Sequence, residues 1–386
     1  MQRGVTGRFE LTAAGGERVR AFVPAPLPPE PPLEMSPERQ RLLENALLAC
    51  GRLDAVTALL PEPDVFLYSY VRREAVLSSQ IEGTQSSLSD LLLFELDDAP
   101  GVPFDDVVEV STYVAALEHG LARLAGGFPL SNRLIREVHG ALLSRGRGAG
   151  KQPGEFRRSQ NWIGGTRPGN ARFVPAPPQE VESCMADLER YLHDPSAPGA
   201  LVKAALAHVQ FETIHPFLDG NGRVGRLLIA LILQNEGVLR QPLLYLSLYF
   251  KQHRAEYYRQ LDSVRTTGDW EAWLDFFLGG VAETAGGAVD TAHRLLAMFE
   301  DDASRVLSLG RAGANALRAF DVLRRRPVTD IDHLAREIHV AYSTAARAVD
   351  ALVEVGVLRE LTGRRRSRVF AYDRYLAALS EGAGPL

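Results

Sequence analysis

Apolar residues recur at every third or fourth position over most of the chain, with polar residues between them, which is the period of an amphipathic α-helix. Capping residues, glycines and prolines separate these stretches from one another. The sequence therefore predicts a mainly α-helical fold. The expected helices lie within residues 36–60, 64–83, 105–127, 131–148, 178–194, 200–215, 222–237, 243–261 and 269–300.

Two regions depart from the helical period. Residues 1–34 carry short apolar runs broken by a Gly-Gly pair and then by closely spaced prolines, which excludes a helix and predicts an extended arm. Residues 159–175 hold two short extended runs around Trp162 and Phe173, with Gly-Gly and Pro-Gly-Asn between them. This second pattern predicts a β-hairpin.

The last part of the chain follows a different pattern. Residues 329–340 and 343–358 read as two short helices joined by a turn, and the runs VLREL and RVFAY then flank the basic segment TGRRRS. This order predicts a winged helix-turn-helix. We expect three domains: an N-terminal arm and helical region (1–108), a helical core (109–285), and a linker helix with the winged helix (286–386).

Charge separates this last part from the rest of the chain. The 386 residues contain 43 Lys and Arg against 48 Asp and Glu, so the whole molecule, at −5, is not a polycation that coats nucleic acid. Residues 311–386 alone hold 13 Arg and 9 acids, a balance of +4. A DNA-binding winged helix would place Ser343 and the following helix in the major groove, with Arg364, Arg365, Arg366 and Arg368 of the wing on phosphates.

The exposed positions of that helix weaken the DNA interpretation. Asp350 and Glu354 would face the phosphate backbone, although Thr344 and Arg347 are compatible with it. The alternative is a module for protein contacts or dimerisation.

Cysteine usage and hydropathy bear on the cellular location of the protein. Cys50 and Cys184 lie far apart without metal-ligand spacing, and the first residues lack the apolar segment of a secretion signal. The most apolar run, residues 227–233, is far shorter than the ~20 residues of a membrane-spanning helix. We expect a cytoplasmic protein with no membrane segment.

The string HPFLDGNGRVGR, residues 215–226, carries the most chemistry. Gly220 and Gly222 permit backbone angles that let successive N–H groups converge on an anion, and a helix begins just after them. Arg223 and Arg226 lie three apart on its first turn, where two guanidinium groups suit two phosphates. The loop therefore predicts a polyphosphate site.

Two further side chains complete this site. Asp219 offers a hard carboxylate oxygen for a magnesium ion that bridges phosphates. His215, with an ordinary histidine pKa near ~6.5, can accept a proton from a hydroxyl that attacks phosphorus. A simple glycine-rich helix start would explain GNG alone but not the whole string. There is no GxxxxGK[ST] of a P-loop, and a zinc site on His208 and His215 lacks a third ligand nearby.

The string resembles the signature HxFx(D/E)GNGRxxR of the Fic (Fido) family at every defined position, and the resemblance extends over about residues 20–285. It implies a Fic-fold helical core that transfers AMP from ATP to a Ser, Thr or Tyr hydroxyl of a target protein or of the chain itself, with Mg²⁺. By this resemblance His215 is the general base, Asp219 holds the magnesium, and Arg223 and Arg226 grip the β- and γ-phosphates. The remaining phosphate contacts come from Gly220, Asn221 and Gly222.

A second family feature is the inhibitory motif (S/T)xxxE(G/N), which SSQIEG matches with Ser78, Glu82 and Gly83. The resemblance implies that Glu82 pairs with Arg226 and denies this arginine to the γ-phosphate. The simpler alternative is a solvated acid at a helix end. In some relatives the same glutamate supports removal of AMP from the target, and the sequence does not distinguish the two directions.

The resemblance also assigns two recognition surfaces. The predicted hairpin resembles the family's flap, on which Trp162, Ile163 and Gly164 position an extended segment of the target. Tyr257 and Tyr258, with Leu261, resemble residues that line the adenine pocket. Homodimers are common in such proteins, so we expect one here.

Two rival functions remain at this point. One is a DNA-binding regulator whose Fic-like core only senses a nucleotide. The other is an enzyme that transfers a phosphate group instead of AMP, as shorter relatives do. An intact His215 favours an enzyme over a sensor, because a sensor needs the phosphate site but no base.

Overall fold

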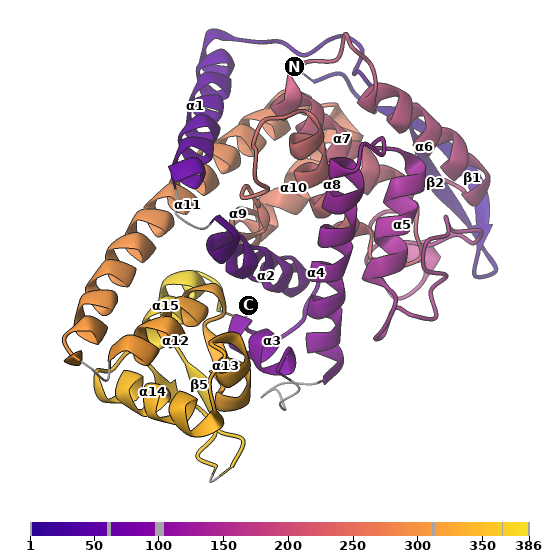
Figure 1. The fold of residues 1–386 in the computed structure, drawn as a ribbon. Helices are drawn as coiled ribbons and strands as arrows, with labels where there is room; N and C mark the ends of the chain where they lie inside the picture. Colours follow the sequence, from indigo (N-terminus) through magenta and orange to yellow (C-terminus); the bar gives the residue numbers. More distant parts are fainter. Residues whose placement is uncertain (1, 60–62, 97–103, 311–312, 365, 385–386) are drawn as a thin grey trace. The chain divides into compact units, whose positions relative to one another are not determined.

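A computed structural model describes residues 2–59, 63–96, 104–310, 313–364 and 366–384, and it confirms the mainly helical fold. The chain forms two compact units, shown by element in Figure 1. The first contains residues 1–52 and 111–285, and the second contains residues 53–110 and 286–386. Three helices run across the boundaries between these segments: α1 (Pro37–Leu59), α4 (Phe104–Ala125) and α11 (Trp270–Leu307).

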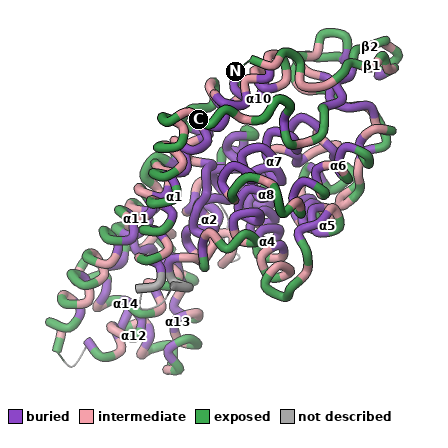
Figure 2. The backbone as a smooth tube through the Cα atoms, turned by 90° about the horizontal axis from the view of Figure 1, so that it is seen from above, coloured by how far each residue is buried: buried purple, intermediate pink, exposed green. Residues whose placement is uncertain are grey.

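Two adjacent helices form the centre of the first unit. Every residue of α7 (Ala200–Ile214) after Ala200 is buried, and α8 (Asn221–Asn235) is buried over most of its length, as Figure 2 shows. Each fully buried Leu or Ile on such a helix contributes about 1.5–3 kcal/mol through removal of apolar surface from water. The loop that carries the predicted chemistry joins these two helices, so buried helices anchor it at both ends. The other elements of this unit are β1 (Gly7–Ala14), β2 (Glu17–Pro24), α5 (Asn132–Leu142), the short 3-10 helix η1 (Pro168–Asn170), α6 (Pro178–Leu192), α9 (Ser247–Gln252) and α10 (Arg254–Thr267).

The N-terminal arm is more ordered than the sequence predicts. Strands β1 and β2 pair antiparallel in register from Gly7 opposite Pro24 to Ala14 opposite Glu17, so the Gly-Gly pair forms the tip of a hairpin. Both tip glycines have positive φ, 55° at Gly15 and 82° at Gly16. The extended arm predicted from residues 1–34 is therefore a β-hairpin over its first part.

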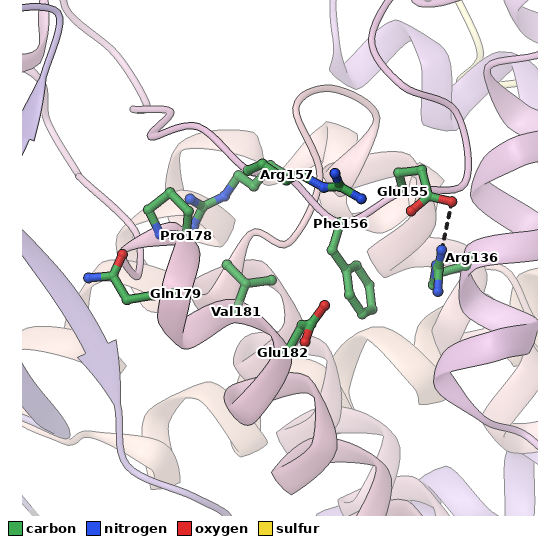
Figure 3. A pocket seen from close by; sticks show the side chains of 9 residues that line it. Arg136, Glu155, Phe156, Arg157, Pro178, Gln179, Val181 and Glu182 are labelled. Atoms are coloured by element: carbon green, nitrogen blue, oxygen red, sulfur yellow. Dashed lines mark hydrogen bonds and ion pairs between the residues drawn. The ribbon is translucent and has the colours of Figure 1, made fainter.

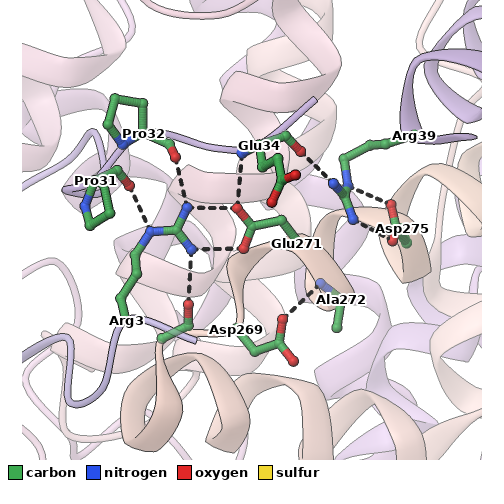
Figure 4. Close-up of polar contacts among 10 residues, drawn as sticks. Arg3, Pro31, Pro32, Glu34, Arg39, Asp269, Glu271, Ala272 and Asp275 are labelled. Carbon is green, nitrogen blue, oxygen red and sulfur yellow. Dashed lines mark hydrogen bonds and ion pairs between the residues drawn. The ribbon is translucent and has the colours of Figure 1, made fainter. Parts of the chain in front are cut away.

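Ion pairs fasten the rest of the arm to α11, as Figure 4 shows. The Arg3 guanidinium donates to both carboxylate oxygens of Glu271 at 2.7 and 2.6 Å, and Arg39 donates to both oxygens of Asp275 at 2.7 and 2.8 Å. The pair at Glu271 is almost fully buried, and its hydrogen bonds lower the pKa of the Glu271 carboxyl to about 2 against the opposing effect of desolvation. Arg3 also donates to the carbonyl oxygens of Pro31 and Pro32 at 2.6 and 2.8 Å, which holds the proline-rich segment against the helical body.

The second unit combines residues from both halves of the chain. The C-terminal part contains a three-stranded antiparallel sheet in the order β3-β5-β4, packed with the helices that the sequence predicts as helix, turn, helix. Strand β3, helix α3 and helix α15 are elements that the sequence analysis did not predict. The elements are α2 (Pro63–Ile81), α3 (Leu88–Phe94), α12 (Gly313–Arg325), β3 (Val328–Asp330), α13 (Ile331–Glu337), α14 (Tyr342–Glu354), β4 (Arg359–Glu360), β5 (Val369–Ala371) and α15 (Asp373–Ser380).

Polar contacts join α2 to the C-terminal elements of this unit. The Gln80 amide is buried and donates to the carbonyl oxygens of Ser86 and Ala383 at 2.9 and 3.2 Å. Arg73 donates to the Glu381 carbonyl at 3.0 Å, so the segment after α15 lies along α2. Both segments belong to the same compact unit.

Among the described helices, none has the length and apolar character needed to cross a bilayer.

Candidate active site

The predicted loop begins where α7 ends. His215 is the C-cap of α7 and adopts a left-handed conformation, with φ 52° and ψ 60°. A residue other than glycine pays about 1–3 kcal/mol for such a conformation, so its surroundings must hold it there. The left-handed turn directs the chain away from the α7 axis and leaves the His215 ring half-buried.

The loop ends at the start of α8 and is closed by an asparagine. Gly220, the N-cap of α8, has φ 75°, an angle that favours glycine. The Asn221 amide then bonds both backbone groups of Phe217: its Oδ1 accepts from the Phe217 N–H and its Nδ2 donates to the Phe217 carbonyl, each at 2.8 Å. Asn221 therefore shapes the loop with its side chain.

A second histidine, which the sequence analysis did not single out, packs against the loop. The His139 ring on α5 stacks on Phe217 with 3.7 Å between ring centroids. Its Nδ1 accepts from the Gly154 N–H at 2.8 Å, so its Nε2 carries the hydrogen and donates to the Asp219 carbonyl at 3.1 Å. Desolvation lowers the His139 pKa to about 4, so this ring is neutral near pH 7 and acts as a fixed hydrogen-bond donor.

The residues predicted to bind phosphate come together at the start of α8. The first N–H groups of an α-helix point out of its N-terminal end, and the helix dipole places positive charge there, so the start of α8 favours an anion. Gly222 is itself helical, so of the two predicted glycines only Gly220 uses the left-handed region. Arg223 and Arg226 are both buried, at 5% and 4% exposure.

Asp219 lies at the lip of this loop. Its side chain is 42% exposed, its Oδ1 accepts from the Gly220 N–H at 2.6 Å, and the same oxygen lies 3.7 Å from Arg223 Nη2. Among the described residues, no group of three His, Cys, Asp or Glu side chains could hold a metal ion. One exposed carboxylate fits a magnesium ion that arrives with a nucleotide and keeps water and phosphate as its other ligands.

The predicted hairpin at residues 159–175 has much less strand than expected. One antiparallel bridge joins Ile163 and Phe173, through N–H to carbonyl bonds of 2.8 and 3.1 Å. Positive φ angles at Gly164 and Gly165, followed by η1, take the chain out of extended geometry beyond this bridge. At its base, Asn161 Nδ2 donates to the Phe217 carbonyl at 2.9 Å, and Trp162 is 38% exposed.

The two tyrosines predicted for an adenine pocket lie in different environments. Tyr257 is 1% exposed, and its ring belongs to an aromatic cluster with His208, Phe250 and Trp273. Tyr258 is half-buried beside it and has surface that a base could contact.

His208 is a structural residue of this cluster. Its Nδ1 lies 2.9 Å from the Gly225 carbonyl and its Nε2 lies 2.8 Å from the Tyr257 hydroxyl. Because the carbonyl can only accept, Nδ1 carries the hydrogen and Nε2 accepts from the tyrosine. Both ring nitrogens of His208 are hydrogen-bonded, so His208 is not available as a zinc ligand beside His215.

The residues of the predicted inhibitory motif belong to the second unit. Ser78 is fully buried on α2, whereas Glu82 and Gly83 form the turn that follows this helix instead of its last residues. Gly83 has φ 104°, and the turn is closed by N–H to carbonyl bonds from Glu82 to Ser79 and from Gly83 to Gln80. Glu82 is exposed.

Comparison with known proteins places this site in a family. Residues 40–122 match the Fic/DOC family N-terminal domain, and residues 129–233 match the Fic/DOC family domain, which contains the whole loop from His215 to Arg226. This chain therefore carries a Fic/DOC N-terminal domain and a Fic/DOC domain. Among curated proteins, the chain is similar to protein adenylyltransferase fic-1 of Caenorhabditis briggsae, at 30% identity over 194 residues, and to protein adenylyltransferase Fic of Drosophila ananassae, at 32% over 178 residues.

These matches cover 47% and 46% of this chain but only 35% and 33% of the two relatives, so the chain spans about a third of the length of the curated relatives it matches. Solved structures show the Fic fold. A Fic family protein from Desulfovibrio desulfuricans superimposes with a TM-score of 0.59 at 19% identity, covering 89% of this chain and 98% of that one. Fic-1 from Caenorhabditis elegans gives 0.52 at 24% identity, covering 68% and 75%.

Proposed function

We propose that this protein transfers AMP from ATP to a Ser, Thr or Tyr hydroxyl of a target protein. The observation that carries the proposal is the loop between α7 and α8, which places a half-buried histidine at one end and a helix N-terminus with two buried arginines at the other. The names of the curated relatives, which are protein adenylyltransferases, support the same reaction.

The reaction needs a base at the first end of the loop. In the proposed step the target hydroxyl oxygen forms a bond to the α-phosphorus of ATP, while the bond from that phosphorus to the β-phosphate oxygen breaks and pyrophosphate leaves. His215 accepts the hydroxyl proton as the general base. The half-buried ring leaves room for the target side chain to approach it.

The second end of the loop holds the triphosphate. Backbone N–H groups at the start of α8 and the guanidinium groups of Arg223 and Arg226 bind the β- and γ-phosphates and stabilise the charge that develops on the leaving pyrophosphate. Asp219 is the residue that would hold magnesium, which neutralises phosphate charge when it is bound. Tyr258 offers the adenine ring a partly exposed surface.

The target is positioned by the flap, residues 159–175. Beyond the bridge at Ile163, the exposed Trp162 and the backbone of Gly164 are free to bind an extended segment of the target. The tie from Asn161 to Phe217 fixes the base of the flap to the same loop that carries His215. A target segment on the flap is thus held at a set distance from the base.

The activity is restrained by Glu82 in this proposal. The carboxylate, presented in the turn closed after α2, pairs with Arg226 and withholds it from the γ-phosphate, so that ATP binds in a geometry unfit for attack. Ser78 and Gly83 fix that turn, the first by its buried position and the second by its positive φ. The same glutamate in the reverse direction would support removal of AMP.

Mass spectrometry of the Glu82→Gly protein, incubated with ATP and magnesium alone and with cell lysate, tests the proposal. We expect an added AMP on the protein itself or on lysate proteins, more than wild type produces, and none when His215→Ala is added. Equal labelling by wild type and Glu82→Gly would show that Glu82 does not inhibit the reaction. Labelling that persists in the His215→Ala variant would show that His215 is not the general base.

The alternative function, a DNA-binding regulator with a nucleotide-sensing core, has less support. On the helix predicted to enter the groove, Asp350 lies 3.7 Å from Arg368 of the wing, so that acid and that arginine partly neutralise each other. Arg364, Arg366 and Arg368 belong to the described wing, and Arg365 lies outside the described residues. The predicted cytoplasmic location and homodimer stay predictions, and sedimentation of the purified protein tests the dimer.

A further inference from the structure

Arg157 is a buried arginine that the proposed reaction does not use. It precedes the flap, is 1% exposed, and lies beside a cavity of about 410 Å³ that Figure 3 shows. Its neighbour in sequence, Arg158, is exposed. A charged group with so little exposure costs several kcal/mol unless hydrogen bonds compensate it, so its partners indicate why it is retained.

Within the described part of the chain, every partner of the Arg157 side chain is a main-chain carbonyl oxygen. Its Nε donates to the His215 carbonyl at 2.8 Å, and its Nη2 donates to the Ile214 carbonyl at 3.3 Å and to the Ala176 carbonyl. Its Nη1 donates to the Ser159 carbonyl at 3.4 Å. The Arg157 backbone N–H adds a bond of 2.9 Å to the Pro216 carbonyl.

These carbonyls come from three places that matter for the reaction. Ile214 and His215 are the end of α7 and the proposed base, Ser159 is the first residue of the flap, and Ala176 follows its last residue. The planar guanidinium fork can bond carbonyls in several directions at once, which the single ammonium of lysine cannot reproduce. Burial lowers the Arg157 pKa to about 10, so the group stays charged at neutral pH.

The conformation of His215 explains the need for such a tie. His215 is a non-glycine residue at φ 52°, and the carbonyl that Arg157 binds at 2.8 Å is its own. Fixing this carbonyl and the preceding one at Ile214 restrains the peptide planes on both sides of the His215 Cα. The orientation of the imidazole is then set relative to both ends of the flap.

We propose that Arg157 is the positioning residue of this site, which holds His215 in its left-handed conformation and keeps it in register with the target segment on the flap. This inference rests on the proposed AMP transfer. Arg157 then acts in the step in which the hydroxyl loses its proton. ATP binding depends on other residues, because Arg157 donates to neither Gly220 nor α8.

The test compares Arg157→Lys with Arg158→Lys, each in the Glu82→Gly protein, by the rate of AMP incorporation and by calorimetric ATP binding. We expect Arg157→Lys to lower the maximal rate at least tenfold while the Kd for ATP changes by less than about threefold. Arg158→Lys should change neither. An unchanged rate in Arg157→Lys, or a loss of ATP affinity as large as the loss of rate, contradicts the proposal.

A second measurement does not depend on activity. The backbone chemical shifts of His215 in the full chain report its φ, and we expect Arg157→Lys to move them out of the left-handed range while Arg158→Lys leaves them in place. Left-handed shifts in Arg157→Lys overturn the positioning role. If the lysine variant folds poorly, Arg157→Gln, which removes the buried charge and keeps two donors, gives the same comparison. No labelling in the Glu82→Gly parent would instead count against the AMP transfer itself.

Discussion

Three histidines in the first unit show how surroundings set the role of one residue type. His215 is half-buried at the end of α7 and is the proposed base, whereas His139 and His208 are fully buried and hydrogen-bonded through both ring nitrogens. Desolvation lowers the pKa of His139 to about 4 and that of His208 to about 3. The two buried rings therefore act as neutral donors and acceptors that hold the fold around the site.

The depressed pKa of His208 predicts an acid-dependent stability. Because the unfolded chain protonates this ring below about pH 6.5 and the folded chain does not until about pH 3, its stabilising effect is complete above pH 6.5 and is lost as the pH falls. Each histidine of this kind contributes a slope of about 1.4 kcal/mol per pH unit in that window.

We expect urea unfolding between pH 6.5 and 4.5 to show a shallower loss of stability in His208→Gln than in wild type. The exposed His253 provides a matched control, and His253→Gln should keep the wild-type slope. A His208→Gln slope equal to that of wild type would show that the ring is not held neutral.

At the level of residues, the sequence analysis singled out the loop but not the residues that support it. Asp219, Arg223 and Arg226 could be singled out as candidates because their residue types and spacing suggest phosphate and metal binding. Arg157 and His139 bind main-chain atoms that are distant in sequence, such as the His215 and Asp219 carbonyls. No residue pattern marks such partners, so only the folded chain brings them together.

At the level of elements, long periodic segments were predictable and short ones were not. The helices that became α7 and α8 were expected almost at their observed bounds, because buried helices carry a sustained apolar pattern. Strand β3 has three residues and pairs with β5, which is remote in sequence, so its local sequence carries little signal. The expected hairpin over residues 159–175 was reduced to one bridge because its glycines adopt positive φ.

Two glycines of helix α11 should respond in opposite directions to alanine. A Cβ at Gly287 would meet no atom within 4 Å, whereas a Cβ at Gly280 would lie 2.6 Å from Tyr249 Cδ1. We expect Gly287→Ala to stabilise the protein by about 0.5–1 kcal/mol, because glycine is unfavourable inside a helix. Gly280→Ala should destabilise it by about 1–3 kcal/mol through overpacking. Thermal unfolding of the two variants measures both effects, and a shift in the same direction for both would contradict this assignment.

The contact between α2 and the segment after α15 gives a second element-scale prediction. Replacing the buried Gln80 by alanine leaves the Ser86 and Ala383 carbonyls without their donor, which should cost about 1–3 kcal/mol in urea unfolding. Gln85→Ala is the matched control, since the Gln85 side chain is exposed, and it should change stability by less than about 0.5 kcal/mol. A Gln80→Ala protein as stable as the control would show that this segment does not pack on α2 in solution.

At the level of the whole molecule, the grouping of segments was beyond sequence reasoning. Residues 53–110 and 286–386 form one compact unit although nearly half of the chain separates them. Periodicity predicts which face of a helix is apolar but not which remote element covers that face. The turn with Glu82 therefore shares a unit with the C-terminal helices and strands.

The charge of the whole molecule bears on the DNA-binding alternative. With a net charge of −5 overall and Asp350 paired to Arg368, we expect no binding of a duplex oligonucleotide at ~0.15 M salt. Fluorescence anisotropy over a salt series measures this directly. Tight binding that weakens steeply with salt would contradict the prediction and favour a role of the C-terminal elements on DNA.

The most direct test of the account uses ATP labelled at either the α- or the γ-phosphate, with the Glu82→Gly protein and magnesium. Transfer of AMP predicts that α-label enters protein, that γ-label does not, and that His215→Ala abolishes the α-label. Incorporation of γ-label would show phosphate transfer, and incorporation of neither label would show that the loop does not catalyse transfer. Either result would contradict the central claim.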